Sequence, residues 1–326
     1  MKVVVLTTSY PTPANPVAGN FVAASVEAAR EAGVVVDVVS PGTFRHFGVA
    51  LGDGIAQNLR AAPWKVALVP PFLGAFAVAA RRAARDADLV HAHWIPSAIA
   101  ARATGKPYVL QMWGTDVALA RRAPWLFRSL VRGARSVVVA SSYLAGEARA
   151  LGARRVEVVP VPVKAPASVG EPAQPPHVLF VGRLSEEKGI LEFLAATEDL
   201  PRVIVGDGPL RDRVPDAVGF IPPAELSPYY ARATVVCVPS RREGYGVTAR
   251  EAIAHRRPVV ATRVGGLVDL AGAGVTLVPA GDVTALRRAI ETALASASRP
   301  EPAGLSPGEV GSALRAVYRA AISDVR

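Results

Sequence analysis

The sequence is poor in cysteine and has no long uninterrupted hydrophobic run. Its 326 residues contain one cysteine, Cys237, which excludes an internal disulfide and a cluster of cysteine metal ligands. The longest apolar stretch, 66–80, holds two prolines and is shorter than the roughly 20 residues that cross a bilayer. The apolar start of the chain, MKVVVL, is too short for a secretory signal. We therefore expect a soluble cytoplasmic protein with a buried, inert thiol.

Acidic residues are scarce in the first half of the chain. Residues 1–163 contain 18 Lys and Arg against 9 Asp and Glu, whereas the remainder holds 19 and 18. This imbalance indicates an anionic partner, which could be nucleic acid, anionic lipid or a phosphorylated substrate. With 51% hydrophobic and 20% charged residues, the chain is typical of a globular protein, and its length favours two domains.

Strand and helix patterns alternate in two separate series. Residues 2–6 and 34–39 are nearly continuous apolar strands on either side of a helical pattern over 20–32, which is typical of a parallel βαβ unit. Residues 164–177 are rich in proline and alanine and are predicted to form a linker. We therefore predict an α/β fold of two Rossmann-like parallel-sheet domains, 1–163 and 178–300, facing each other across a cleft that holds the site. The second series is expected to include a short strand near 217–221.

The strongest local motif is GRLSEEKG, which follows the first strand of the second domain at 182–189. Gly182 allows a ligand to approach the backbone, and Arg183 and Lys188 bring two cations to one loop. Fixed cations of this kind stabilise a departing diphosphate, which carries several negative charges. A solvated charged loop is an equally good interpretation of this motif taken alone.

A second motif, SRREGYGVTAREA, spans 240–252 between an apolar strand and a helix. Glu243 and Glu251 are eight residues apart, and the helix is expected to begin near Gly246, where free backbone N–H groups would attract an anion. The alternative is two exposed glutamates on a surface helix. Two further segments are weaker: VGDGP at 205–209 is predicted to be a turn, and VGG at 264–266 could be another ligand-side loop.

Taken together and in this order, these motifs resemble the retaining GT-B glycosyltransferases of family 4, the group 1 domain, over about 178–295. The resemblance implies that Arg183 and Lys188 contact the diphosphate of a sugar nucleotide. It implies that Glu243 holds the donor sugar and that Glu251 binds the ribose. It also implies backbone contacts to the donor and a site for the base; the residues are Gly182, Gly244, Tyr245, Gly246, Val247, Phe220 and Ile221.

The first half resembles the same family more weakly. Gly19 occupies the place of a family glycine that approaches the donor phosphate. His93, near the end of a strand, is an acceptor-side candidate, and we expect His91 to point to the opposite face of that strand. Trp113 stands where the family often has histidine, and it could stack on a sugar. Asp116 could equally bind a sugar or cap its loop.

Residues 121–135 form a basic, arginine-rich helical pattern that also contains Trp125, Leu126 and Phe127. The pattern fits either a helix packed on the sheet or one whose arginines face anionic lipid. The last helix, within 301–326, resembles the family helix that crosses back to the first domain. Asp86 and Asp88 have the D-x-D spacing of a metal site, but they precede a strand in the first half.

The resemblance therefore implies an enzyme that moves a sugar from a nucleoside-diphosphate donor to an acceptor hydroxyl with retention of configuration. The products would be a glycolipid, a polysaccharide or another glycoconjugate. We expect no cofactor, no required metal and no nucleic-acid partner, and we allow a peripheral contact with an anionic membrane at its inner face. The alternatives are a sugar-nucleotide epimerase of the same fold and a non-catalytic basic binding protein.

Overall fold

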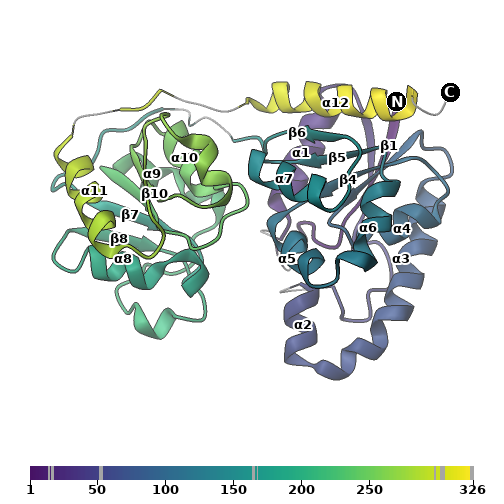
Figure 1. The fold of residues 1–326 in the computed structure, drawn as a ribbon, viewed down its shortest axis with the longest axis horizontal. Helices are drawn as coiled ribbons and strands as arrows, with labels where there is room; N and C mark the ends of the chain where they lie inside the picture. Colours follow the sequence, from purple (N-terminus) through teal and green to yellow (C-terminus); the bar gives the residue numbers. More distant parts are fainter. Residues whose placement is uncertain are drawn as a thin grey trace. The chain divides into compact units, whose positions relative to one another are not determined.

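The computed structural model describes residues 1–13, 15, 18–50, 54–163, 166, 168–296, 299–301 and 305–323. The chain forms two compact units, which are treated separately below (Figure 1). Unit 1 comprises Met1–Pro162 together with Pro307–Arg326, and unit 2 comprises Val163–Ser306. The segment expected as a linker lies at the start of unit 2, and residues 164, 165 and 167 of it are outside the described residues.

Unit 1 contains a six-stranded parallel sheet in the order β2-β1-β3-β4-β5-β6. The valine-rich inner strands are buried throughout, as expected for parallel strands covered on both faces. The strands are β1 (Lys2–Leu6), β2 (Val35–Val39), β3 (Leu89–His93), β4 (Tyr108–Met112), β5 (Ser136–Val139) and β6 (Val156–Val158). The helices are α1 (Asn20–Glu31), α2 (Ile55–Ala61), η1 (Pro63–Leu68), α3 (Val69–Ala83), α4 (Ser97–Ala103), α5 (Gly114–Arg122), α6 (Pro124–Gly133), α7 (Ser142–Ala150) and α12 (Pro307–Ser323).

The C-terminal helix α12 completes the cover of this sheet. Right-handed crossovers place α1 on one face and the helices from α3 to α7 on the other, because the strand order reverses after β2. Helix α12 packs against α1, β3 and β4, so it covers the part of the face that α1 alone would leave open (Figure 1). The contact is close: a Cβ added to Gly311 would lie 2.0 Å from the carbonyl oxygen of Ala28.

Unit 2 contains a five-stranded parallel sheet in the order β11-β10-β9-β7-β8. No strand forms at 217–221, contrary to our expectation; Gly219 makes only an isolated bridge with Gly206. The strands are β7 (Val178–Val181), β8 (Arg202–Val205), β9 (Val235–Val238), β10 (Val259–Thr262) and β11 (Val275–Val278). The helices are η2 (Glu186–Lys188), α8 (Ile190–Ala196), η3 (Arg211–Arg213), η4 (Pro223–Glu225), α9 (Ser227–Arg232), α10 (Val247–Ala254), η5 (Gly265–Leu270) and α11 (Val283–Ala295).

The sheet of unit 2 separates two apolar cores. Residues of α8 and α11 pack on one face, and residues of α9, α10 and η5 pack on the other. Cys237 of β9 lies in the first core, and burial raises the pKa of its thiol above the usual range. The expectation of a buried cysteine is confirmed.

The apolar stretch 66–80, which we expected to be too short to cross a membrane, lies within a longer helical segment. The chain is helical from Pro63 to Ala83, because Pro70 and Pro71 occupy the first turn of α3, where a missing N–H costs nothing. Among the described residues this is the one helix long and apolar enough to cross a membrane by length and composition. Only 17% of its apolar window is buried.

Candidate functional site

The candidate donor residues of unit 2 lie in loops at the carboxyl ends of its strands. Gly182 and Arg183 follow β7, and the segment from Ser240 to Gly246 follows β9. Because β7 and β9 are paired parallel neighbours, their carboxyl ends meet at one edge of the sheet, where α/β proteins bind ligands. The fold therefore brings the two strongest sequence motifs together.

Gly265 and Gly189 allow two neighbouring loops to pack closely against the backbone that follows β9. Gly265 has φ +50, and a Cβ there would lie 1.7 Å from the carbonyl oxygen of Glu243. Gly189 has φ +71, and its Cβ would lie 2.0 Å from the carbonyl oxygen of Pro239. The N–H of Gly266 also donates to the Glu243 oxygen at 3.1 Å. The loop at 264–266, which the sequence alone marked only weakly, thus supports the backbone of Glu243.

Lys188 and Glu243 form an ion pair in the middle of this region. The Nζ of Lys188 lies 2.7 Å from Oε2 of Glu243, and the side chains are 34% and 14% exposed. The Ser240 hydroxyl donates to the same carboxylate oxygen at 3.5 Å. Arg183 is exposed, and within the described part of the chain no carboxylate pairs with it. One cation is therefore held by the glutamate and the other is open to solvent.

Further ion pairs hold the two loops together, and the sequence analysis missed them. Arg241 donates to Glu192 at 2.6 Å, and Arg242 pairs with Glu187 at 3.0 Å. Part of the signal was present in the sequence, because the run Arg-Arg-Glu at 241–243 complements Glu-Glu-Lys at 186–188. The partner of Arg241, Glu192 on α8, lies outside these runs. These contacts join the segment after β9 to η2 and α8.

The N-terminus of α10 lies directly after Glu243. Gly246 has φ +82 and precedes the first residue, Val247, whose side chain is exposed. The first-turn N–H groups of such a helix have no partner within it, and they attract negative charge. Tyr245 is buried with the guanidinium carbon of Arg250 4.1 Å from its ring centre. Its side chain therefore packs inside the unit, and only its backbone is available to a ligand.

Glu251 has a partner that the sequence did not suggest. The hydroxyl of Tyr230, on α9, donates to Oε2 of Glu251 at 2.7 Å. Burial raises the pKa of Glu251, and the bond from Tyr230 opposes that rise. Phe220 is 56% exposed and Ile221 is half-buried, just after the bridge of Gly219 to the end of β8.

In unit 1, Gly19 stands at a position that requires glycine. Its φ is +63, and an added Cβ would lie 2.3 Å from the carbonyl oxygen of Ser9. It precedes α1 directly and accepts the first hydrogen bond of that helix, from Val22. The loop that carries Gly19 is thereby pressed onto the segment after β1.

The two histidines of β3 lie on the same face, so our expectation of opposite faces is wrong. Residues two apart in a strand share a face, and the ring centres of His91 and His93 are 4.4 Å apart. The ring of Trp113 stacks on His93 at 5.9 Å, and Phe21 meets Trp113 edge-on at 4.5 Å. Trp113 is 8% exposed, so its ring is largely covered by protein. Among the described atoms, its Nε1 and the Nδ1 of His93 are buried without a partner.

Asp116 caps the loops at this end of the sheet. Its carboxylate accepts hydrogen bonds from the N–H of Trp113 at 2.8 Å and from the N–H of Ile95 at 3.0 Å. It thus links the loop after β3 to the loop after β4. Burial raises the pKa of Asp116 to about 7, although the backbone hydrogen bonds act against this rise. The sequence left open whether Asp116 binds a sugar or caps its loop; in the structure it caps the loop.

The arginine-rich segment divides into α5 and α6. On α6, Phe127, Leu130 and Val131 are buried against unit 1, whereas Trp125 is 78% exposed. Three apolar side chains therefore pack inward, whereas Trp125 and Leu126, the latter 50% exposed, do not.

The D-x-D pattern lies at the other end of the strands. Asp88 accepts a hydrogen bond from the N–H of Lys2 at 2.8 Å and so joins the starts of β3 and β1. Its position is remote from the carboxyl ends that carry the candidate residues of this unit.

The buried histidines predict a dependence of stability on pH. Burial lowers the pKa of His91 to about 3 and that of His93 well below its usual range. The unfolded chain takes up these protons below about pH 6.5, so their contribution is present above that pH and is lost as the pH falls towards 3. Between pH 7 and 5 we expect His91 to cost about 2 kcal/mol. Asp116 acts in the opposite direction, since its folded pKa is raised.

The measurement is urea unfolding at pH 7 and pH 5 for the native protein and His91→Gln. We expect the variant to lose about 2 kcal/mol less than the native protein over this range. Equal losses in the two proteins would contradict the buried neutral state of His91.

Two family descriptions match adjoining parts of the chain. "Glycosyltransferase Family 4" matches residues 18–165, and "Glycosyl transferases group 1" matches residues 175–296. D-inositol 3-phosphate glycosyltransferase 1 of Catenulispora acidiphila is 31% identical over 99% of this chain and 96% of its own length. The putative teichuronic acid biosynthesis glycosyltransferase TuaC of Bacillus subtilis is 28% identical over 83% of each chain.

Solved structures share the fold over nearly the whole length. Sucrose-phosphate synthase from Thermosynechococcus elongatus has a TM-score of 0.73 at 19% identity, covering 100% of this chain and 97% of its own. Anabaena HepE in complex with UDP-glucose has a TM-score of 0.68 at 16% identity, covering 100% and 99%. The protein is therefore an enzyme of the GT-B class, a glycosyltransferase. Within that class, the chain belongs to glycosyltransferase family 4 and carries the group 1 domain.

Proposed function

We propose that the enzyme transfers a sugar from a nucleoside-diphosphate sugar to an acceptor hydroxyl with retention of configuration. The observation that carries this proposal is the ion pair of Lys188 and Glu243 beside the start of α10. It places a cation, a carboxylate and free helix N–H groups in one loop region, which suits a diphosphate attached to a sugar. HepE, which shares the fold, has been crystallised with UDP and with UDP-glucose, and this supports a nucleotide-sugar donor.

In the proposed reaction, Lys188 and Arg183 bind the diphosphate together with the N–H groups of α10. When the phosphates engage Lys188, Glu243 loses its partner and becomes free to accept hydrogen bonds from the donor sugar. The leaving phosphate assists deprotonation of the acceptor, so no carboxylate nucleophile is assigned. Neutralisation of the phosphates falls to these side chains and the helix, and no metal is assigned either.

The acceptor residues are proposed in unit 1. His93 is neutral at pH 7 because burial holds its pKa low, so it would act as a hydrogen-bonding group. The unpartnered Nδ1 of His93 and Nε1 of Trp113 are polar atoms that an acceptor hydroxyl or a water molecule could satisfy. TuaC is named for teichuronic acid biosynthesis and the Catenulispora relative for D-inositol 3-phosphate, and these names support an acceptor with sugar-like hydroxyl groups.

The test uses donors alone, so that water is the only acceptor hydroxyl. Thermal shifts with UDP-, GDP- and ADP-sugars identify the nucleotide, since a ligand at 100 times its Kd stabilises by about 2.7 kcal/mol. NMR of the sugar first released then reads its anomeric configuration. We expect the configuration of the donor; the opposite anomer would overturn the assignment of retention.

The same experiment separates the alternatives. A sugar-nucleotide epimerase would convert the donor to an isomeric sugar without releasing it to an acceptor. A non-catalytic binding protein would show salt-sensitive binding of anions and no donor cleavage. Either result would replace the proposed function.

Tyr230 is proposed as a positioning residue for the donor ribose. Its hydroxyl fixes one oxygen of Glu251, which leaves the other free to bind a diol. Tyr230→Phe should raise the KM for the donor about 10- to 150-fold, because a hydrogen bond to a charged group contributes about 1.5–3 kcal/mol, with kcat nearly unchanged. Steady-state kinetics check this. Tyr229→Phe is the control, and a fall in kcat at constant KM for Tyr230→Phe would contradict the role.

We propose that the enzyme works in the cytoplasm with peripheral access to an anionic membrane. The exposed Trp125 and the arginines of α6 are one candidate contact.

A further inference from the structure

The helical segment Pro63–Ala83 of unit 1 is apolar on its outward face as well as on its inward face. Phe72, Phe76 and Ala80 are buried inward, and the ring of Phe76 stacks on Phe44 with 4.8 Å between the ring centres. These contacts fasten the segment to the unit, so it lies on the protein surface and does not leave it to span a bilayer.

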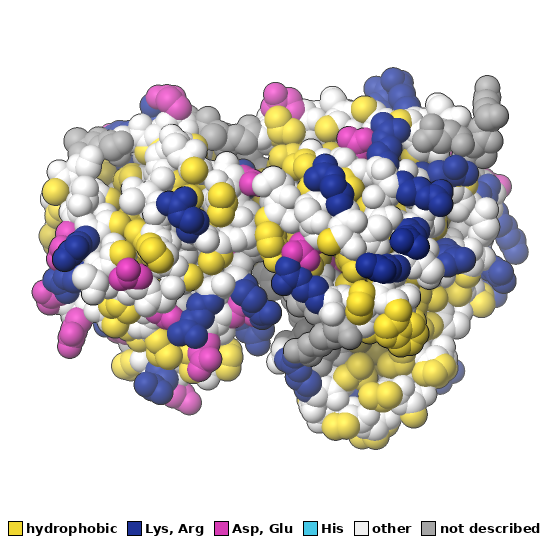
Figure 2. All heavy atoms as spheres, viewed as in Figure 1, with side chains coloured by type: hydrophobic (Ala, Val, Ile, Leu, Met, Phe, Trp, Pro, Cys, Tyr) yellow, Lys and Arg dark blue, Asp and Glu magenta, His cyan; other side chains and the backbone are white. Residues whose placement is uncertain are grey.

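Exposed residues recur along the outward face at helical spacing. We call this set the α3 stripe; it consists of Trp64, Ala67, Pro71, Gly74 and Val78. Trp64 is 68% and Val78 is 48% exposed, and Val66 beside the stripe is 58% exposed. Figure 2 shows hydrophobic side chains gathered at the end of unit 1 that holds α2 and the start of α3. A helix that is apolar all round is normally buried. We therefore expect another molecule to bind this exposed face and exclude water from it.

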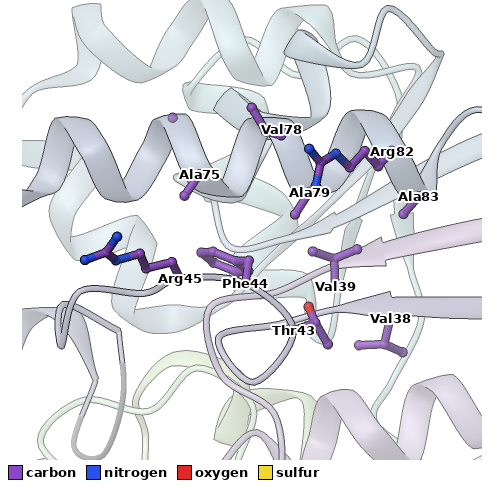
Figure 3. Close-up of a pocket in the computed structure, with 11 residues that line it drawn as sticks. Val38, Val39, Thr43, Phe44, Arg45, Ala75, Val78, Ala79, Arg82 and Ala83 are labelled. Carbon is purple, nitrogen blue, oxygen red and sulfur yellow. The ribbon is translucent and has the colours of Figure 1, made fainter.

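A groove of about 600 Å³ adjoins the C-terminal half of the stripe. Apolar side chains such as Val39, Phe44 and Val78 line it, and Figure 3 shows Arg45 and Arg82 towards its two ends. Within the described residues, neither arginine forms an ion pair with a carboxylate. A molecule that binds this groove must therefore be apolar where it contacts the lining side chains and anionic near the two arginines.

The charge of the surrounding residues distinguishes between the possible binding partners of this face. Residues 40–85 contain six basic residues and one acidic residue, Asp53. A second copy of the chain would bring the same arginines together in a symmetric contact without carboxylates to pair with them. An anionic bilayer supplies both parts, because its phosphates attract arginine and its interface accepts apolar side chains and tryptophan.

We propose that the α3 stripe lies in the interface of an anionic phospholipid bilayer, with Trp64 among the headgroups and with Arg45 and Arg82 bound to lipid phosphates. This surface is distinct from α6 and requires nothing of the donor site. Its function would be to hold the enzyme where a lipid-linked acceptor is found.

The experiment is co-sedimentation of the full chain with vesicles of phosphatidylcholine alone or mixed with phosphatidylglycerol. The native protein should bind the mixed vesicles, and added salt should weaken the binding. Val78→Glu should lower the partition constant about 10-fold or more, because a carboxylate would enter an apolar, anionic interface. Replacing both arginines, Arg45→Gln and Arg82→Gln, should cost about 5-fold for each.

A matched control is available at the other edge of the sheet. Val158 of β6 is 49% exposed, nearly the same as Val78, and Val158→Glu should leave binding unchanged. If Val78→Glu does not fold by circular dichroism, Trp64→Ser at the more exposed end of the stripe replaces it, with the same loss expected. Brominated lipids should quench tryptophan fluorescence of the native protein more strongly than that of Trp64→Phe.

Three results would overturn the proposal. The first is a native protein that does not bind the mixed vesicles. The second is loss of binding in Trp125→Glu but not in Val78→Glu, which would assign the membrane contact to α6. The third is a dimer in solution that Val78→Glu abolishes, in a protein without affinity for lipid. None of these measurements uses a donor, so their failure would leave the proposed sugar transfer untouched.

Discussion

Replacing Lys188 with alanine should lower the rate of sugar transfer about 10²–10³-fold, the cost of removing one group that stabilises charge in a transition state. The proposed role is neutralisation of the departing diphosphate, so kcat should fall together with the affinity for the free nucleoside diphosphate. The free energy of unfolding should fall by only about 1–2 kcal/mol, because Lys188 is 34% and Glu243 14% exposed, which lies between an exposed ion pair and a buried hydrogen bond to a charged group. Donor consumption and thermal unfolding measure the two effects separately.

The control is Arg242→Ala, which removes a neighbouring cation paired with Glu187 at 3.0 Å. Arg242 is 69% exposed, and no site role is assigned to it, so turnover should stay within about two-fold of the native rate, since such surface changes rarely matter. Near-native turnover in Lys188→Ala would remove the basis of the proposed mechanism.

Glu243→Gln separates the two members of the ion pair. If Lys188 serves the phosphates and Glu243 serves the sugar, this variant should keep its affinity for the nucleoside diphosphate and lose transfer. A parallel loss of nucleotide affinity would mean that Glu243 acts only by holding Lys188 in place.

The sequence predicted the architecture well because parallel strands leave a clear pattern. Valine-rich runs such as 235–238 and the restart of the pattern at 178 specify two covered parallel sheets. The motifs after β7 and β9 could be placed together for the same reason, since the carboxyl ends of neighbouring parallel strands share one edge. The family matches and the solved structures confirm the GT-B fold.

What the sequence could not predict depends on contacts between distant residues. The bond from Tyr230 to Glu251 joins two helices, and no local pattern reports it. The same is true of Tyr318 on α12, whose hydroxyl lies 2.8 Å from Nδ1 of His91. The shared face of His91 and His93, by contrast, follows from the sequence alone, because the period of a strand places residues two apart on one side.

The length of the apolar helix could not be taken from the apolar run alone. The run 66–80 was expected to be too short to cross a bilayer, but the chain is helical from Pro63 to Ala83, because the first turn of a helix tolerates proline. The outward side of this helical segment is apolar.

Gly265→Ala should be among the most damaging single changes in unit 2. The added Cβ would lie 1.7 Å from the carbonyl oxygen of Glu243, and φ +50 is costly for alanine. Backbone cannot move aside as a flexible side chain can, so we expect a loss of about 3 kcal/mol or more in the free energy of unfolding. Because the displaced carbonyl belongs to Glu243, transfer activity should fall even at temperatures where the variant stays folded.

Gly281→Ala isolates the conformational part of this effect. Gly281 has φ +80, and nothing lies within 4 Å of an added Cβ, so this variant carries the backbone strain without the collision. We expect it to cost about 1–2 kcal/mol with native activity. Urea unfolding and donor turnover of the two variants give the comparison. Equal stabilities of the two variants would show that φ alone makes glycine necessary at 265. A larger loss in Gly265→Ala, together with reduced turnover, would show that the collision also matters. Glycine is then needed at 265 because the loop after β10 supports the residue whose carboxylate faces Lys188.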